Sequence, residues 1–209
     1  VPFSRYIFNT VFITLAATVG HVLIASMAAF PLAKHVFPGK NILNAMILLS
    51  LMFVPAVADV ANYITMAGLG WIDTYFAVIV PFIGTSLGIF LMRNYMTTIP
   101  DSLLDSSKID GSGDLRTFWT IIMPIVKPAW LTLTIIMFQT VWGQPHTLYI
   151  YREEMKTLPY ALSQIVAGGI IRAGAGQAVG VMMMIVPATV FVINQAKILE
   201  TMATSGIKE

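Results

Sequence analysis

The chain has no cysteine and few charged residues, and each shortage excludes a class of protein. Without cysteine, neither a disulfide framework nor a thiolate metal site can form. Only 11% of the 209 residues are charged, whereas soluble globular domains have about 25%. The net charge is only +2 and the basic residues are dispersed, which argues against a nucleic-acid partner. The three histidines, His21, His35 and His146, do not have the spacing of metal ligands.

The sequence also lacks the glycine-rich loop with which P-loop ATPases bind nucleotide phosphates. The nearest stretch, FPGKN, contains Gly39 and Lys40 but neither the upstream glycine nor the hydroxyl residue that should follow the lysine. We therefore expect no ATP hydrolysis by this chain and no cofactor bound by it.

Apolar residues, in contrast, are abundant: they make up 57% of the chain, and the mean hydropathy is +0.80. A helix needs about 20 apolar residues to cross the hydrocarbon core of a bilayer. We predict an all-α membrane protein, with residues 1–209 forming one polytopic helical bundle of about five spans. The predicted spans are 6–30, 42–66, 75–92, 129–149 and 178–199.

The distribution of basic residues predicts the orientation of these spans. If the loop after the first span faces the cytoplasm, eight of the twelve lysines and arginines lie on that side, as the positive-inside rule requires. Residue 1 is then outside and residue 209 inside. The eight are Lys34, Lys40, Arg93, Lys108, Arg116, Lys127, Lys197 and Lys208.

Polar side chains within the spans are candidates for function, because an unpaired polar group is costly in hydrocarbon. Asp59, Asn62 and Gln139 are possible pore or interface residues, although Asp59 falls late enough in its span to face outer water instead. For His21 we predict a neutral side chain that is hydrogen-bonded to a neighbouring helix. Interfacial aromatic belts are predicted from Trp71, Trp142 and Tyr149 on the outside, and from Trp119 and Trp130 on the inside.

The most charged part of the chain reads LLDSSKIDGSGDLRTFWTIIMPIVKP and follows the third predicted span. We interpret residues 97–124 as an insert on the cytoplasmic side. Thr98 followed by Asp101 has the form of a capping box, which predicts a helix over about Pro100–Asp110. Gly111 suits the left-handed position that ends such a helix.

A second short helix is predicted to begin at Ser112–Asp114 and to end at Pro124. At about 1.5 Å per residue, neither helix can cross a bilayer, so the two should form a helical knob on the membrane surface. From the residues alone, an ordinary interfacial loop stays open as the alternative. The apolar face of the second helix is predicted to consist of Leu115, Phe118, Trp119 and Ile122.

The insert resembles the signature loop of inner-membrane permease subunits of ATP-binding-cassette importers. That signature reads Glu-Ala-Ala, three residues, Gly, nine residues, Ile, one residue, Leu-Pro. The spacing is kept here, with Asp for Glu, Ser for Ala and Met for Leu, and Asp110 and Pro128 are typical of the sugar-importer branch. The matching positions are Asp105, Ser106, Ser107, Gly111, Ile121, Met123 and Pro124.

The resemblance extends along the whole chain. The stretch AAFPLAKHVFPGK is similar to the end of the second span of carbohydrate permeases, KTLPYALSQ to their outer loop before the last span, and ETMATSGIKE to their tail. Those subunits usually have six spans, so we expect that the first one is missing from this sequence and that the chain is truncated.

The resemblance implies a sugar permease that works by alternating access in a bacterial inner membrane, as a multi-pass protein with a cytoplasmic C-terminus. Its partners would be membrane lipid, a second homologous permease, an extracellular or periplasmic solute-binding protein and two cytoplasmic ATPase subunits that bind ATP and Mg. The residues expected to couple to the ATPase are Leu103, Leu104, Asp105, Ser106, Ser107, Asp110, Gly111 and Pro124, with Gly206 and Lys208 in a tail that touches it.

Two other functions stay open. One is a permease of the same superfamily for a non-sugar solute such as a polyamine or an amino acid. The other is a secondary transporter without an ATPase, for which an internal repeat would be typical. The sequence has no such repeat, and its acidic residues lie mainly in predicted loops.

Overall fold

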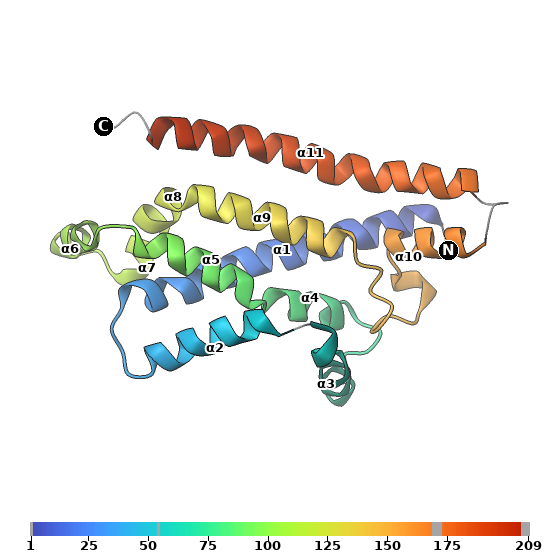
Figure 1. The fold of residues 1–209 in the computed structure, drawn as a ribbon, viewed down its shortest axis with the longest axis horizontal. Helices are drawn as coiled ribbons and strands as arrows, with labels where there is room; N and C mark the ends of the chain where they lie inside the picture. The colour runs from blue at the N-terminus through green and yellow to red at the C-terminus, as the bar shows by residue number, and fades with distance from the viewer. Residues whose placement is uncertain (1, 54, 169–172, 206–209) are drawn as a thin grey trace.

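The computed structural model describes residues 2–53, 55–168 and 173–205, and every regular element in these ranges is helical (Figure 1). A π-helical turn over Phe118–Ile122 joins α7 to α8, and a 3₁₀ turn over Glu153–Met155 precedes α10. The α-helices are α1 (Phe3–Lys34), α2 (Lys40–Met52), α3 (Pro55–Gly68), α4 (Tyr75–Ile83), α5 (Ser86–Thr97), α6 (Asp101–Ile109), α7 (Asp114–Thr117), α8 (Met123–Ile125), α9 (Lys127–Trp142), α10 (Leu158–Ala167) and α11 (Ala173–Ser205).

The prediction of an all-α membrane protein is confirmed, but the spans are less regular than predicted. Three helical stretches are long and apolar enough to cross a membrane: Phe3–Lys34, Tyr75–Thr97 and Gly174–Ile193. A fourth is the pair formed by Asp114–Ile125 and Lys127–Trp142, which is bent by 78°. The first, third and fifth predicted spans therefore correspond to α1, to α4 with α5, and to α11.

Two of the predicted spans were wrong in extent. The span over 42–66 consists of two helices, α2 and α3, with Phe53 in an extended conformation and Pro55 in the first position of α3, where its missing N–H is not needed. The span over 129–149 ends as a helix at Trp142. The stretch that was assigned to a loop before the last span forms α10, with Pro159 in its first turn.

The first helix, α1, is the centre of the bundle and packs against α4, α5, α9 and α10. Its buried positions recur every three or four residues, as a helix buried along one side requires. Many of them are small or hydroxyl-bearing, which lets neighbouring backbones approach closely. They include Thr10, Ile13, Thr14, Ala17, Thr18, His21, Ala25 and Ala29.

Breaks in the helices leave backbone carbonyls without a helical donor, and the indole N–H groups of two tryptophans bond to two of these carbonyls. Pro187 has no N–H for the carbonyl of Met183 in α11, and the indole Nε1 of Trp142 donates to that oxygen at 3.0 Å. At the bend between α8 and α9, the indole Nε1 of Trp130 donates to the carbonyl of Met123 at 3.2 Å. Trp142 is therefore buried, and its assignment to the outer aromatic belt was wrong.

The third break lies between α4 and α5, where His21 fills the gap from α1. The side chain of His21 is fully buried, and its Nδ1 lies 2.9 Å from the carbonyl oxygen of Ile83, the last residue of α4. The carbonyl can only accept, so Nδ1 carries the proton. The predicted hydrogen bond from His21 to a neighbouring helix is confirmed.

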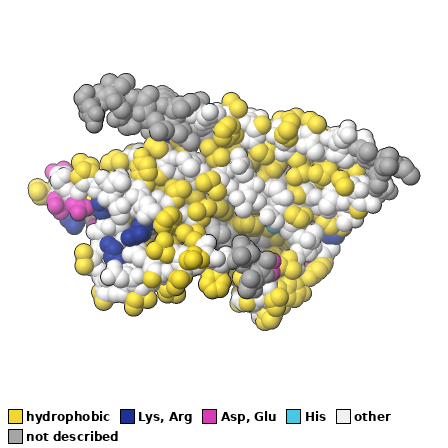
Figure 2. Space-filling model, in the orientation of Figure 1, with side chains coloured by type: hydrophobic (Ala, Val, Ile, Leu, Met, Phe, Trp, Pro, Cys, Tyr) yellow, Lys and Arg dark blue, Asp and Glu magenta, His cyan; other side chains and the backbone are white. Residues whose placement is uncertain are grey.

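The two ends of the bundle differ in composition. The loop between α1 and α2, the short helices α6 and α7, and the far end of α11 lie at one end, which we call the insert end (Figure 1). On the face shown in Figure 2, most charged side chains gather there, whereas the middle is yellow and white. The opposite end holds the start of α1, α10 and the loop over 143–157.

At the opposite end, a buried asparagine fastens α1 to the loop before α10. The side-chain amide of Asn9 donates to the carbonyls of Glu154 at 2.8 Å and Lys156 at 2.9 Å. Its Oδ1 accepts a hydrogen bond of 2.9 Å from the hydroxyl of Tyr75 in α4. The start of α1 is thereby held by two other parts of the chain.

The contact of His21 with α5 should make Gly88 intolerant of any side chain. A Cβ atom on Gly88 would lie 2.1 Å from Nε2 of His21, so Gly88→Ala must displace a buried ring and should cost about 1–3 kcal/mol. We expect a lower thermal midpoint for the detergent-solubilised chain, measured by fluorescence-detected size exclusion.

The matched control is Gly180→Ala in α11, where a Cβ would meet nothing within 4 Å. This change should leave the midpoint the same or raise it, because alanine favours a helix over glycine. Equal midpoints for the two variants would contradict the close packing of His21 on α5.

Candidate functional site

The insert end carries the residues that the sequence singled out, and its first helix ends as predicted. Gly111 has φ +74°, its N–H donates to the carbonyl of Lys108 at 3.0 Å, and the N–H of Ser112 donates to that of Ser107 at 3.0 Å. This pair of bonds is a Schellman motif, which requires a left-handed residue and so favours glycine. The chain turns sharply here from α6 towards α7.

The predicted capping box at the start of α6 is absent. The hydroxyl of Thr98 donates to the carbonyl of Tyr95 at 2.8 Å instead of capping α6, and Pro100 occupies the N-cap position. Asp101 is engaged elsewhere, because its carboxylate accepts a hydrogen bond from the ammonium group of Lys34 at 2.7 Å. This bond holds the pKa of Asp101 below its usual value.

The helix α6 has one face on the bundle and one face towards solvent. Leu104 and Ser107 are buried, at 7% and 4% exposure, and Leu104 belongs to the same core as Phe118. On the other face, Leu103 is 40% exposed and Ile109 is 86% exposed. The exposed group also contains Asp105, Ser106, Asp110 and Gly111.

The candidate coupling residues therefore divide into two sets. Leu104 and Ser107 hold α6 to its own bundle, whereas the exposed residues form a surface that another protein can reach. Ile109 belongs to this surface and was missed in the sequence. The exposure of Ile109 could have been predicted from the sequence. Ile109 is five positions from Leu104, which puts it on a different side of the helix, and it lies between the charged residues Lys108 and Asp110.

The second half of the insert continues past Pro124, so the predicted end there was wrong. Residues Phe118–Ile122 form a π-helical turn in which the N–H of Met123 donates to the carbonyl of Phe118, five residues back. Such a wider turn accommodates a proline, which has no N–H and clashes with the preceding turn of an α-helix. The helix then runs on to Ile125 and bends into α9.

The predicted apolar face of this second helix was also wrong in part. Phe118 and Ile122 are buried, at 3% and 0% exposure. Leu115 and Trp119, one turn apart, are 65% and 45% exposed. The four side chains thus form two stripes, of which only one packs on the core, because the bundle reaches the insert from one side.

One serine and one threonine join the halves of the insert to each other. The hydroxyl groups of Ser107 in α6 and Thr117 in α7 are buried and lie 2.7 Å apart. A buried hydroxyl without a partner would be destabilising. The two positions therefore need small hydroxyl side chains that lie within hydrogen-bond distance of each other.

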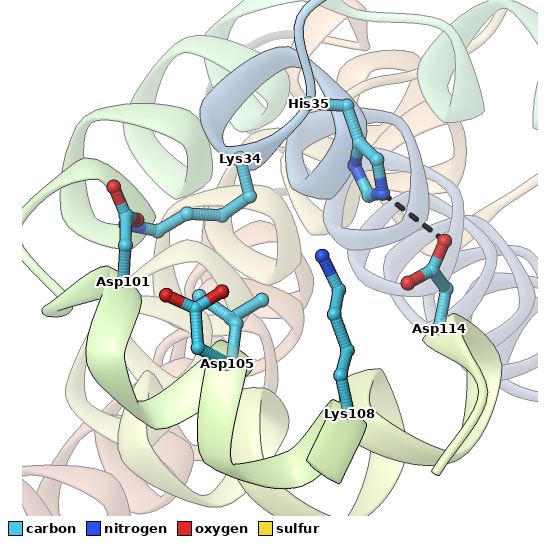
Figure 3. Close-up of a pocket in the computed structure, with 7 residues that line it drawn as sticks. Lys34, His35, Asp101, Asp105, Lys108 and Asp114 are labelled. Atoms are coloured by element: carbon cyan, nitrogen blue, oxygen red, sulfur yellow. Dashed lines mark hydrogen bonds and ion pairs between the residues drawn. The ribbon is translucent and has the colours of Figure 1, made fainter. Parts of the chain in front are cut away.

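The end of α1 reaches both halves of the insert across a polar pocket (Figure 3). Besides its bond to Asp101, the ammonium group of Lys34 donates to the carbonyl of Ile99. Nε2 of His35 lies 3.1 Å from a carboxylate oxygen of Asp114, the first residue of α7. The pocket has a volume of about 290 Å³ and is lined by Lys34, His35, Asp101, Leu104, Asp105, Lys108 and Asp114.

A comparison with known protein families identifies the family of the chain. Residues 21–201 match the family described as binding-protein-dependent transport system inner membrane component. The chain belongs to this family. The predicted resemblance to importer permeases is thereby confirmed.

Curated relatives in this family include two transport-system permease proteins. The sn-glycerol-3-phosphate transport system permease protein UgpE of Yersinia enterocolitica is 32% identical over 143 residues, which cover 68% of this chain and 51% of that protein. The arabinooligosaccharides transport system permease protein AraQ of Bacillus subtilis is 32% identical over 167 residues, which cover 79% of this chain and 59% of that protein. The chain thus spans about half the length of these relatives.

Solved structures show the same fold. A bacterial ABC transporter involved in the import of the acidic polysaccharide alginate matches with a TM-score of 0.83 at 24% identity, over 93% of this chain and 74% of that one. The MetNI methionine ABC transporter, in inward-facing conformations, matches with a TM-score of 0.66 at 18% identity, over 95% of both chains.

The remaining candidate residues lie away from the insert. Asp59 in α3 and Gln139 in α9 are exposed, and Asn62 is half-buried. Burial and, second, the charge of Asp59 raise the pKa of Tyr149, which places Asp59 near the end opposite the insert. The pore or interface role of these three residues stays a prediction. Gly206 and Lys208 lie outside the described residues.

The described residues contain no group of three histidine, aspartate or glutamate side chains that could hold a metal ion. Pro124, which follows the π-helical turn, is exposed.

The bond between Ser107 and Thr117 should govern how readily the insert opens. Ser107→Ala and Thr117→Val each remove one buried hydrogen bond, worth about 1 kcal/mol, or roughly fivefold in the opening equilibrium. We expect faster trypsin cleavage at Lys108 and Arg116, followed by mass spectrometry, with the double variant cleaved no faster than the faster single one.

The control for this cycle is Thr120→Val, which removes only an exposed hydroxyl bonded to the carbonyl of Arg116. This variant should be cleaved at the wild-type rate. Additive effects of Ser107→Ala and Thr117→Val would mean that the two hydroxyl groups act independently.

Proposed function

We propose that the chain is a permease subunit of an ATP-driven importer and translocates a carbohydrate or a related polyol solute. Packed helices would switch between outward and inward openings, which is rigid-body movement of the kind that membrane bundles support. The observation that carries the proposal is the geometry of α6. A short helix fixed to the bundle by Leu104 and Ser107 presents Leu103 and Ile109 to a partner.

The partner at this surface would be a cytoplasmic ATPase subunit. An exposed apolar side chain beside carboxylates suits a groove that is apolar at its floor and basic at its edge, so Asp105 would face a basic group there. Two such ATPase subunits would bind ATP and Mg and carry out the hydrolysis. Gly206 and Lys208 of the tail would touch the same subunits.

The membrane part also requires a partner. None of the residues of α2 is buried within this chain, and Ile42, Met46 and Met52 are exposed by 60% or more. We propose that a second, homologous permease covers part of such surface and that lipid covers the rest. A solute-binding protein outside the cell would deliver the solute to the end opposite the insert.

The names of the relatives support a carbohydrate or polyol solute. One is a permease for sn-glycerol-3-phosphate and one for arabinooligosaccharides, and the fold is shared with an importer of the polysaccharide alginate. A non-sugar solute is the second candidate, because the methionine transporter has the same fold. A secondary transporter without an ATPase would leave the exposed surface of α6 without a purpose.

The absence of cysteine allows a clean test of the orientation. A cysteine introduced at Ser102, exposed on α6, should resist an impermeant thiol reagent in intact cells, and one at Glu154 should react. Glu154 is a suitable position because it is exposed, whereas Thr157 nearby is 1% exposed. Labelling in the reverse pattern would place the insert outside the cell and reject the proposed contact with a cytoplasmic ATPase.

Gly111 allows a test of the coupling surface itself. Gly111→Leu places a side chain at φ +74° and should cost about 1–2 kcal/mol, too little to unfold the bundle. The new side chain would also hold α6 away from its partner. We expect normal abundance in the membrane, but loss of the co-purified ATPase and of solute uptake.

The matched control is Gly113→Leu, since Gly113 is also exposed, has φ −73° and has nothing within 4 Å of a Cβ. We expect it to keep the ATPase bound and to transport. If Gly111→Leu keeps its ATPase and transports as well as the control, α6 is not the coupling surface.

A further inference from the structure

We infer that Lys34 and His35, at the end of α1, are positioning residues that make the insert and α1 move as one body. The inference rests on the proposed function, because it assigns to α1 the movement that α6 would exchange with the ATPase. Neither residue belongs to the surface that a partner can reach on α6. Their role follows from where their bonds go.

The first bond ties α1 to the start of α6. The side chain of Lys34 is only 5% exposed, and its ammonium group donates to the carbonyl of Ile99 and to the carboxylate of Asp101. A nearly buried cation needs its partners, and although the side chain of Asp101 is 79% exposed, the ammonium group of Lys34 is held against the start of α6. Lys34 lies in the last turn of α1 and Asp101 in the first turn of α6, where each charge also suits its own helix dipole.

The second bond ties the next residue of the chain to the other half of the insert. Nε2 of His35 donates to the carboxylate of Asp114, the first residue of α7, at 3.1 Å. The ring of His35 packs edge-on against Phe30 at 5.3 Å, and Phe30 lies 5.5 Å from Phe118. The carbonyl of His35 accepts a hydrogen bond from Lys40 at 2.9 Å, which fixes the backbone where α1 ends.

The last residue of α1, Lys34, and the next residue, His35, thus hold the first residues of both helices that Gly111 separates. The bond between Ser107 and Thr117 already joins these helices, so the two ties and that bond form a closed frame. Figure 3 shows Lys34 and His35 pointing to opposite walls of the pocket from adjacent positions. Because the starts of α6 and α7 are both bonded to the end of α1, the insert cannot rotate about the covalent segments that join it to α5 and α9.

The alternative mechanical connection is much weaker. Along the chain, the insert is joined covalently to α5 before it and to α9 after it. Residues 98–100 form the whole connection between α5 and α6. Without the ties to α1, a tilt of α6 relative to the bundle would be resisted mainly by the packing of Leu104. With them, α6 follows α1, which packs on α4, α5, α9 and α10 and is fastened by Asn9 at its other end.

The test removes one tie and leaves the surface of α6 intact. Lys34→Met keeps an unbranched apolar side chain, one atom shorter than lysine, but removes both of its hydrogen bonds. Lys127→Met is the matched control, because Lys127 is exposed at the start of α9 and lies outside both this pocket and the surface of α6. Wild type and variants are compared as the full complex with its ATPase and binding protein in lipid nanodiscs.

Two measurements distinguish a positioning role from a structural one. Spin labels at Ser102 in α6 and Val19 in α1, both exposed, report whether α6 is fixed relative to α1. Solute moved per ATP hydrolysed reports coupling. We expect Lys34→Met to bind the ATPase as wild type does, to broaden the distance distribution and to lower the transport ratio several-fold. Lys127→Met should change neither.

An unchanged distance distribution in Lys34→Met would overturn the inference, and so would a broadened distribution with an unchanged transport ratio. If Lys34→Met does not accumulate in the membrane, His35→Phe replaces it, since a phenyl ring keeps the packing on Phe30. If that variant also fails to accumulate, the two residues act in folding and the inference is wrong.

Failure of the proposed function can be told apart from failure of the inference. The label distance is measured in the chain itself and does not depend on where an ATPase binds. A complex in which Gly111→Leu has no effect but Lys34→Met loosens α6 would reject the coupling surface and leave the frame in place.

Discussion

A backbone carbonyl without a donor cannot be left inside a bilayer, and this constraint shapes the bundle more than any other. Prolines and bends break the helices, and side chains from other segments replace the missing donors. Trp142 does so for Met183, Trp130 for Met123, and His21 for Ile83. Because each donor lies outside the turn that it completes, each also fastens one helix or half-helix to another. The breaks thereby become points of attachment.

A related constraint acts at the insert end, where the buried group carries a charge. Lys34 cannot lie near the interior without partners, and both of its partners belong to the start of the insert. The buried hydroxyl groups of Ser107 and Thr117 follow the same rule within the insert. Polar groups that must be satisfied thus determine where α6 lies, while apolar packing of Leu104 and Phe118 supplies the contact area.

The sequence was sufficient to predict the membrane class, the first span and the left-handed Gly111, because each depends on local composition or on one special backbone position. It was insufficient where tertiary contacts decided the outcome. Asp101 caps nothing because Lys34, 67 residues earlier, takes its carboxylate. Trp142 is no interfacial residue because Pro187 exposes a carbonyl that its indole can reach. In the second insert helix, Phe118 and Ile122 are buried but Leu115 and Trp119 are exposed, because the bundle covers this helix from one side only. The spacing of apolar residues in the sequence does not show which of them the bundle covers.

The burial of Ser107 changes how the family signature in this loop can be understood. Ser107 occupies the second of the two small-residue positions of that signature, yet its side chain is enclosed by its own chain. A small residue there would be retained by selection on the folding of each subunit separately, even in lineages whose ATPase partner had changed. The exposed positions beside it would instead vary together with that partner. If the exposed positions contact an ATPase as proposed, one short motif is subject to two separate constraints, one from its own fold and one from its partner.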